Sequence, residues 1–408
     1  MVDRSPDARG EHRQRPDQRE RDERLRGGRC AEVGGETSDA ERDKDEAGCA
    51  EPMSNTTVGK GSIHADATVR KVGGGAARSA AEYGRSVAAS KSPGLEIKVG
   101  ERVVRVSNPD RVYFPASGAT KLDLVNYYVS VGPGIVNALR ERPCMLHRFP
   151  TGVSGEKVHQ KRVPAGAPPW LHTVRLFFPR YGQHADELCV TELAEVIWAV
   201  QMSTVEFHPW NSRQADTEKP DEWRIDLDPM PDCPFATIRR VAGVAREVLD
   251  DLGAVGWPKT SGGRGIHIYV RIDPAHGFTD VRRAALAFAR EVERRAPADV
   301  TTTWWRKDRD PTAVFVDYNQ NARDHTMAAA YSVRGFPDAR VSTPITWDEI
   351  DDVEPADLTI GTVPARFAAL GDLHADIDAA VFHIDQLLEW AARDEHEGAA
   401  DPGQPDQD

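Results

Sequence analysis

Asp226 and Asp228 stand two residues apart in the stretch EWRIDLDPMP, residues 222–231, with apolar neighbours on either side. Because side chains alternate along a strand, both carboxylates would project from one face, about 6.5–7 Å apart at Cα. At that separation they can converge on hard cations spaced about 3.5–4 Å apart. Alternating acids of this kind are more often a solvated sheet face, so the pair alone does not decide between the two readings.

A third carboxylate and a histidine follow on two further strand-like stretches. In AVFVDYNQN, residues 313–321, Asp317 lies opposite the valines, and in GIHIYVRI, residues 265–272, His267 lies opposite the isoleucines. If these strands share a sheet with helices on its apolar side, the other face gathers three carboxylates and a histidine. Oxygen ligands select Mg²⁺ or Mn²⁺ over zinc. The pattern predicts a two-metal site for phosphoryl transfer.

The stretch KTSGGRGIH, residues 259–267, combines glycines with Ser261 and Arg264 directly before a strand. Glycines let a backbone approach phosphate oxygens, while a hydroxyl and a guanidinium can donate to them. The stretch is not a P-loop, because it lacks the G-K-[ST] ending and the following helix. A glycine-rich hairpin turn is the plain alternative. The accompanying histidine and cation favour a cradle for a triphosphate.

The elements that would position these residues have an α/β pattern. Alternating residues predict a hairpin, and periodic apolar residues predict helices. A buried helix-to-strand passage lies between them. These elements are a hairpin over 95–107, a helix over 120–142 that Pro143 stops, the passage over 193–207, and helices over 235–252 and 280–295.

Composition sets the boundaries of the folded part. Residues 1–81 contain no aromatic residue, so we expect residues 1–93 to be disordered, residues 94–392 to form one domain, and residues 393–408 to be a disordered acidic tail. The net charge is −13, but from residue 346 onward there are 2 basic and 17 acidic residues, against 33 and 31 in residues 95–345. The acidity therefore belongs to the C-terminal part, and a local basic groove remains compatible with the charge.

Two classes of protein are disfavoured by the sequence. The five cysteines are scattered without a C-x-x-C pair, which argues against a zinc knuckle or a disulfide framework. No run approaches the length of about 18 apolar residues that a membrane span needs. We therefore expect a cytoplasmic protein, located at the nucleoid, without a membrane partner.

Five motifs together resemble the polymerase domain of bacterial ATP-dependent DNA ligase D, a branch of the archaeo-eukaryotic primase superfamily. They are VEFHPWNSR, DLDP, KTSGGRGIHIYV, VDYNQNAR and YSVRG, and the resemblance runs from about residue 95 to 388. It implies a primase fold, classed as α/β (α+β), in which an RRM-like catalytic sheet accompanies a helix-flanked α/β subdomain. The sequence contains no K-x-D-G ligase motif and no phosphoesterase-like histidine cluster, so we expect a stand-alone polymerase module.

The resemblance also implies roles for individual residues. Two Mg²⁺ or Mn²⁺ ions would be held by Asp226, Asp228 and Asp317, which would be the catalytic residues. The incoming nucleotide would be bound by His208, Ser261, Arg264, His267, Gln320 and Arg334. Arg264 stands where a lysine is common in the family.

Two further sites follow from the resemblance. Lys121 matches a lysine that holds the 5′-phosphate of downstream DNA at a gap, and Arg111 takes the place of a second cation. Relatives commonly carry two phenylalanines that stack on the base and the template, whereas this chain has Val158 and His159. Stacking by His159 would be weaker.

The implied function is template-dependent nucleotide transfer that fills gaps and repairs ends during double-strand break or excision repair, with a preference for ribonucleotides. DNA and NTP or dNTP would be its substrates, Ku and a separate ATP-dependent ligase its candidate partners, and we expect a monomer. Two alternatives remain open. One is a primase that starts strands de novo, and the other is a non-catalytic module that binds DNA ends.

Overall fold

The computed structural model describes residues 67–70 and 94–399. Its strands are β1 (Ala67–Arg70), β2 (Gly94–Val99), β3 (Arg102–Ser107), β4 (Val112–Phe114), β5 (Ala119–Thr120), β6 (Pro143–Arg148), β7 (Val158–Gln160), β8 (Thr173–Phe178), β9 (Gln183–Cys189), β10 (Thr204–Pro209), β11 (Glu222–Pro229), β12 (Trp257–Thr260), β13 (Ile266–Arg271), β14 (Val300–Thr301) and β15 (Val314–Val316). Its α-helices are α1 (Lys121–Ser130), α2 (Gly132–Leu139), α3 (Leu193–Gln201), α4 (Phe235–Leu252), α5 (Phe278–Arg295), α6 (Val363–Leu370) and α7 (Asp385–His396). Short 3₁₀ helices are η1 (Pro179–Tyr181), η2 (Arg306–Asp308), η3 (Tyr318–Asn321), η4 (Trp347–Glu349), η5 (Pro355–Asp357) and η6 (Ile377–Ala379).

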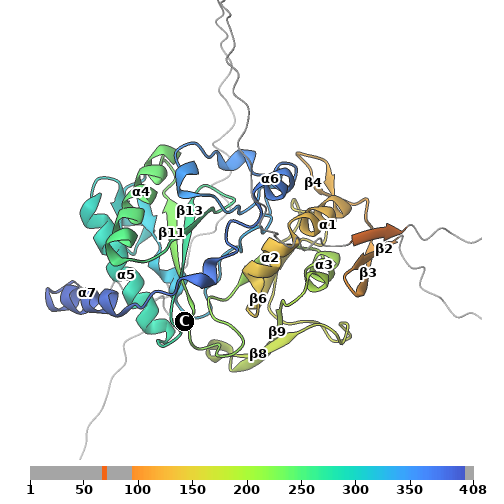
Figure 1. The fold of residues 1–408 in the computed structure, drawn as a ribbon, viewed down its shortest axis with the longest axis horizontal. Coiled ribbons are helices and arrows are strands. Elements are labelled where there is room, and N and C mark those ends of the chain that lie inside the picture. The colour runs from red at the N-terminus through yellow and green to blue at the C-terminus, as the bar shows by residue number, and fades with distance from the viewer. Residues whose placement is uncertain (1–66, 71–93, 400–408) are drawn as a thin grey trace, which may run out of the picture. The chain divides into compact units, whose positions relative to one another are not determined.

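One five-stranded sheet, here named the aspartate sheet, has the order β12-β13-β11-β15-β14. Its pairs are antiparallel except β14 with β15. The apolar faces of its strands pack with α4 and α5 in one core, which includes Ile225, Leu227 and Ile268. Figure 1 shows these two helices beside β11 and β13. The helices cover one face of the sheet, as predicted, so the alternating polar residues are left for the other face.

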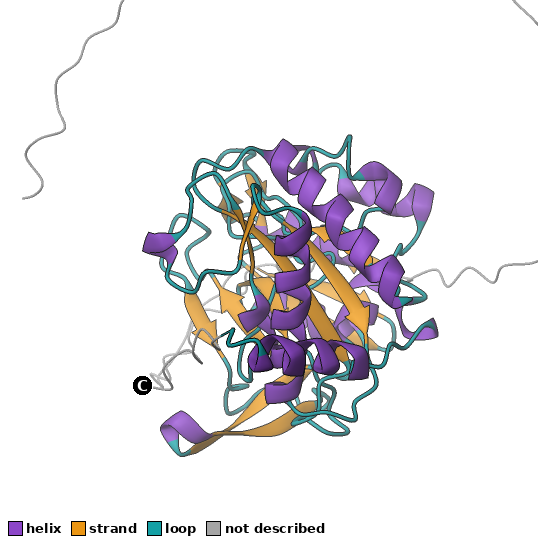
Figure 2. Ribbon diagram, turned by 90° about the vertical axis from the view of Figure 1, so that its left-hand side faces the viewer, coloured by secondary structure: helices purple, strands orange, loops and turns teal. Residues whose placement is uncertain are grey.

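A second sheet, here named the N-terminal sheet, has the order β10-β6-β9-β8, with β7 paired to β6. It shares a core with α1, α2 and α3, which includes Leu124, Ile135 and Phe207. Strands β8 and β9 form a hairpin that extends beyond the helices (Figure 2). The predicted mixed α/β architecture is confirmed.

The segment from residue 120 to 142 differs from its prediction as one helix. Helix α1 ends at Ser130 and α2 begins at Gly132, with Val131 between them in a non-helical conformation. Pro133 stands in the first turn of α2. Because proline lacks an N–H and clashes with the carbonyl four residues earlier, a continuous helix cannot pass this point. The prediction missed an internal proline that breaks the periodic pattern.

The predicted ends of the domain also differ from the structure. Strand β1 lies inside the range expected to be disordered and pairs antiparallel with β2. Helix α7 continues to His396, past the predicted end at residue 392. Its last turn contains the buried Asp394, whose Oδ1 lies 3.5 Å from Nη1 of Arg294 on α5. Residues 1–66, 71–93 and 400–408 of the predicted disordered segments lie outside the described part of the chain.

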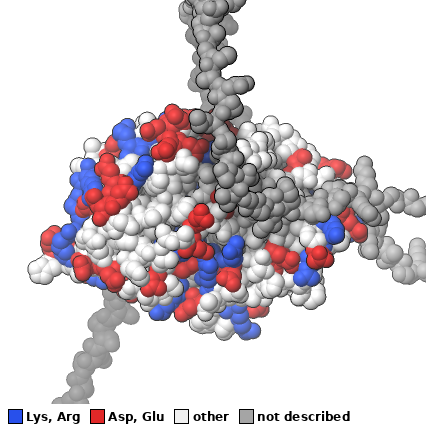
Figure 3. Space-filling model, in the orientation of Figure 1, with Lys and Arg blue, Asp and Glu red and all other residues white. Residues whose placement is uncertain are grey.

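Charged side chains are distributed without large separation on the face shown in Figure 3. Among the described residues seen there, acidic and basic groups are interspersed. In the described part of the chain, no helix is long and apolar enough to cross a membrane.

Candidate active site

Asp226, Asp228 and Asp317 come together on the polar side of the aspartate sheet. Asp226 and Asp228 both lie on the central strand β11. Asp226 pairs with His267 of β13, and Asp228 pairs with Phe315 of β15. The backbone N–H of Asp317, directly after β15, donates to the carbonyl of Asp226 at 2.9 Å. Two segments that are distant in sequence, β11 and the end of β15, thus bring the three acids to one place, in the arrangement that the alternation predicts.

The carboxylates at this place oppose one another's ionisation. Burial raises the pKa of Asp226 well above its usual range, and the charges of Asp317 and Asp228 raise it further. Burial and Asp317 also raise the pKa of Asp228. A half-buried group of acids that supplies only oxygen donors fits hard divalent cations, because a cation would remove this repulsion.

Three arginines lie near Asp228 and partly offset the negative charge. Arg264, Arg306 and Arg309 each lower the pKa of its carboxyl. Arg264 is held by the loop after β11, where its Nη2 donates to the carbonyls of Met230 at 3.0 Å and Pro231 at 2.9 Å. Sequence reasoning missed Arg306 and Arg309, although the run WWRKDRD, residues 304–310, is the charge signal that marks them.

A buried lysine supports the histidine next to Asp226. Lys259 Nζ lies 2.8 Å from His267 Nδ1 and donates to the carbonyl of Ala328 at 2.9 Å and to Ser342 Oγ at 2.6 Å. His267 Nε2 lies 3.4 Å from Asp226 Oδ1. The structure therefore places His267 between Lys259 and a predicted metal ligand, and its predicted contact with nucleotide stays a prediction.

The SGGRG turn lies tightly against the central strand. Ser261 Oγ accepts hydrogen bonds from the N–H groups of Gly263 at 3.1 Å and Gly265 at 3.0 Å, which close the turn. A Cβ on Gly265 would lie 2.5 Å from the carbonyl oxygen of Leu227 in β11. Arg334 Nη1 donates to the Ser261 carbonyl at 2.5 Å. The turn therefore carries Arg264, whose charge acts on Asp228, and contacts Arg334, whose charge acts on Asp226.

Gln320 lies against a carboxylate in this structure. Its Nε2 donates to Asp317 Oδ2 at 2.9 Å, and the N–H of Asn319 donates to Asp317 Oδ1 at the same distance. Both residues belong to η3, which begins after Asp317. Gln320 orients Asp317, and a contact between Gln320 and nucleotide stays a prediction.

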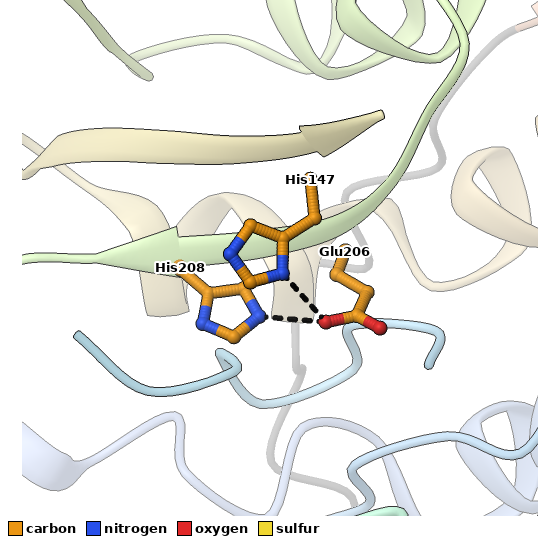
Figure 4. A group of neighbouring side chains, drawn as sticks. All are labelled: His147, Glu206 and His208. Carbon is orange, nitrogen blue, oxygen red and sulfur yellow. Dashed lines mark hydrogen bonds and ion pairs between the residues drawn. The ribbon is translucent and has the colours of Figure 1, made fainter. Parts of the chain in front are cut away.

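A second group of possible metal ligands lies in the N-terminal sheet. One ligand atom from each of His147, Glu206 and His208 lies within 4.8 Å of the others (Figure 4). Glu206 Oε2 is 2.8 Å from His147 Nδ1 and 2.9 Å from His208 Nε2. Sequence reasoning identified His208 but missed the other two, although Glu206 stands in the quoted motif VEFHPW.

Burial and hydrogen bonding together set the charges of His147, Glu206 and His208. Burial lowers the pKa of His208 to about 3 and also lowers that of His147. Burial opposes the ionisation of Glu206, but hydrogen bonds from both histidines and the charge of Arg334 outweigh it and hold its pKa below the usual range. At neutral pH the group therefore consists of a carboxylate between two uncharged imidazoles.

His159, the residue expected to stack on a base, borders this group. It lies on β7 and pairs with His147 of β6. The two ring centroids are 4.5 Å apart in an edge-to-face arrangement, and His159 is exposed. The exposed ring has room for a base, although stacking itself stays a prediction.

Lys121 begins α1, but its side chain is buried. Its Nζ donates to the carbonyl of Ser107 at 3.1 Å, the carbonyl of Gln201 at 2.6 Å and Gln201 Oε1 at 2.9 Å. Burial, together with the charges of Arg111 and Arg148, lowers its pKa to about 8. The structure thus gathers three cations at the start of α1, and sequence reasoning missed Arg148.

Arg111 lies exposed at the same place. Its Nη1 donates to the carbonyl of Pro150 at 2.6 Å. A group of like charges is favourable only beside an anion, so this place fits the predicted phosphate contact. The contact stays a prediction.

Comparisons with known proteins point to one family. Residues 120–374 match the family model described as LigD, primase-polymerase domain. The multifunctional non-homologous end joining protein LigD of Pseudomonas aeruginosa is 33% identical over 276 residues, which are 65% of this chain and 32% of that protein. The LigD of Mycobacterium tuberculosis H37Rv is 31% identical over 298 residues, 71% of this chain and 39% of that protein. The chain thus spans about a third of the length of these curated relatives.

A solved structure gives the same result for the fold. The polymerase domain of Mycobacterium tuberculosis ligase D, solved in complex with DNA, superposes with a TM-score of 0.63 at 31% sequence identity. The match covers 68% of this chain and 98% of that domain. The predicted primase fold is therefore confirmed, and the chain belongs to the LigD primase-polymerase domain family.

Proposed function

We propose that this protein is a template-dependent nucleotidyltransferase that extends a DNA primer across gaps and at broken ends. The observation that carries the proposal is the convergence of Asp226, Asp228 and Asp317 on one face of the aspartate sheet. Their raised pKa values indicate a site that needs cations. The named relatives act in non-homologous end joining, and the structural neighbour binds DNA, which supports the same substrate here.

The reaction would join a primer 3′-oxygen to the α-phosphorus of a nucleoside triphosphate and release pyrophosphate. Two Mg²⁺ or Mn²⁺ ions held by the three aspartates would, when bound, ease deprotonation of the 3′-hydroxyl and balance charge on the phosphates. The protein itself would position the reactants and supply fixed charges.

The triphosphate would be bound by Arg264, Arg334 and the SGGRG turn beside the three aspartates. Arg334 is tied to the SGGRG turn, and Arg264 lies near Asp228. Both guanidiniums can turn to phosphate oxygens, because the carbonyls that they contact in this structure are neutral acceptors and a phosphate offers a charged partner. His208 of β10 would border the nucleotide, while the single N–H of its uncharged ring donates to Glu206.

The DNA contacts would lie at the start of α1. Lys121 and Arg111 would bind the 5′-phosphate at the downstream end of a gap. This contact would set the position of the gap relative to the active site. A preference for ribonucleotides and cooperation with Ku and a separate ligase are further parts of the proposal that rest on the family resemblance.

Primer extension tests the proposed function. The substrate is a duplex with a one-nucleotide gap, offered in turn with each of four ribonucleotides and four deoxyribonucleotides in Mn²⁺. We expect addition of the nucleotide that matches the template, and no addition after EDTA treatment. Addition that ignores the template, or no addition to any primer, would contradict the proposal. Synthesis on a template without a primer would favour the de novo primase instead.

A further inference from the structure

Glu206 is a buried carboxylate that the proposed chemistry does not use. It lies on β10 with 3% of its surface exposed. Its neighbours come from segments far apart in the sequence: His147 from β6, Lys157 from the loop before β7, and Arg334 and Gly335 from the segment after η3. One side chain therefore connects the N-terminal sheet with the segment that carries Arg334.

Both carboxylate oxygens of Glu206 are engaged. Oε2 contacts His147 Nδ1 at 2.8 Å and His208 Nε2 at 2.9 Å, and lies 3.7 Å from Arg334 Nε. Oε1 accepts the backbone N–H of Gly335 at 2.7 Å. Because each of these contacts fixes one polar atom of its partner against a buried carboxylate, they restrain the orientation of two imidazole rings and of the backbone beside Arg334.

The approach of Gly335 shows how closely this region is fitted. A Cβ at residue 335 would lie 2.4 Å from the ring of Phe149 and 3.0 Å from Glu206 Oε1. Only glycine allows the backbone to reach the carboxylate here. The Arg334 guanidinium is thereby held between Glu206 and the Ser261 carbonyl, which it contacts at 2.5 Å.

The groups that Glu206 holds surround the proposed nucleotide. His208 and Arg334 are predicted to contact the triphosphate, and His147 stacks on His208 with ring centroids 3.7 Å apart. His147 also meets His159, the predicted base contact, edge to face. Glu206 is thus hydrogen-bonded to His147 and His208 (Figure 4), and through the ring of His147 it is linked to His159.

A metal ion is the other possible use of this group, and its surroundings disfavour one. Lys157 Nζ and Arg334 Nε lie 3.6 and 3.7 Å from the same oxygen of Glu206. A divalent cation bound to that oxygen would stand beside two positive charges. The charge of Glu206 is already balanced by protein groups.

We propose that Glu206 is a positioning residue for the nucleotide, acting through His147, His208 and Arg334. This inference rests on the proposed function. It makes a prediction of definite sign, because a carboxylate near a triphosphate repels it. If Glu206 acted only through its charge, removing that charge would strengthen nucleotide binding, whereas loss of a positioning group weakens it.

The test compares Glu206→Gln with the wild type in gap filling with the templated ribonucleotide. We expect the KM for nucleotide to rise roughly 10- to 100-fold, as for the loss of charge-assisted hydrogen bonds. The kcat should change little, because the three aspartates are unaffected. Equilibrium titration of the same nucleotide, without primer, should show the same loss of affinity.

Glu195→Gln is the matched control. Glu195 is also fully buried, and its Oε1 accepts from the backbone N–H of His172 and contacts its Nδ1, both at 2.7 Å, but it lies on α3 outside the nucleotide group. This substitution should lower Tm without changing KM. Glu206→Asp provides a second variant, which keeps the charge but shortens the side chain, and we expect it to raise KM as well.

Three results would overturn the inference. One is an unchanged or lowered KM in Glu206→Gln, and another is a wild-type KM in Glu206→Asp, which would show that charge alone matters. The third is Zn²⁺ or Mn²⁺ bound by an Asp226→Asn variant and lost when Glu206→Gln is added, which would make the group a metal site. Failure of the wild type to extend any primer would refute the proposed function, whereas extension with an unchanged KM in the variant would refute only the role of Glu206.

Discussion

The contact between Lys121 and a downstream 5′-phosphate should depend on pH in a range where an ordinary lysine does not titrate. Burial, with Arg111 and Arg148 nearby, lowers the pKa of Lys121 from 10.5 to about 8. At about 1.4 kcal/mol per pKa unit, this difference disfavours the ammonium form by roughly 3 kcal/mol. The unbound protein therefore loses the Lys121 charge as pH rises through about 8.

The size of the effect follows from this pKa. A terminal phosphate is a dianion above pH of about 6, so its own charge is constant over the range. At pH 9.5 about 3% of the unbound protein would carry the ammonium, which would weaken phosphate binding by up to about 30-fold. Lys121 Nζ already donates to three acceptors on Ser107 and Gln201, so a bound phosphate would have to replace one of them.

The assay measures Kd for gapped DNA with a 5′-phosphate or a 5′-hydroxyl on the downstream strand, between pH 7 and 9.5. We expect the advantage of the phosphate to be constant up to about pH 8 and to fall above it, and to be much smaller at every pH in Lys121→Met. Lys121→Arg stays charged over this range, so any advantage that it retains should not fall with pH. A phosphate advantage that is unchanged at pH 9.5, or that persists in Lys121→Met, would refute the assignment and favour Arg111.

Two other predictions concern the nucleotide and the turn. Arg264→Ala and Arg334→Ala should each raise the KM for nucleotide, because each loses a charge-assisted contact of roughly 1.5–3 kcal/mol, while the Kd for DNA changes little. Loss of DNA binding at an unchanged KM would place these arginines in the DNA groove instead. Gly265→Ala should lower the free energy of unfolding by about 1–3 kcal/mol in denaturant titrations, because its Cβ would lie 2.5 Å from the Leu227 carbonyl oxygen. The control is Gly243→Ala on α4, where a Cβ meets nothing within 4 Å and should not destabilise the protein. Equal stability of both variants would mean that the turn can move away from β11.

The aspartate sheet was predictable because its pattern is local and two-faced. Alternation alone places Ile225 and Leu227 in the core and Asp226 on the opposite face, and the register of Asp226 with His267 follows once β11 and β13 are neighbours. Helix α4 was predictable for the same reason, since its apolar stripe ends at Gly253, which adopts a left-handed conformation.

Other features depend on contacts that no local pattern carries. Glu206 reads as one polar residue in a strand, and its partners are brought to it from residues 147, 157 and 334 only by the fold. The sequence around Lys121 is typical of a surface lysine at the start of a helix, yet its ammonium group is buried against Gln201, which is 80 residues away in the sequence. The break between α1 and α2 was visible in the sequence at Pro133, and there the prediction gave periodicity too much weight over the proline.

The central claim is that Asp226 and its two neighbours hold the cations for nucleotide transfer. The most direct measurement compares Asp226→Asn with Asp348→Asn, a control whose side chain is 95% exposed, in one-nucleotide gap filling with Mn²⁺ and in binding of gapped DNA. We predict that Asp226→Asn abolishes addition while DNA binding stays equal to or tighter than in the wild type, because a charge that repels phosphate has been removed. The control should behave as the wild type does. Addition by Asp226→Asn at the rate of the wild type would contradict the account.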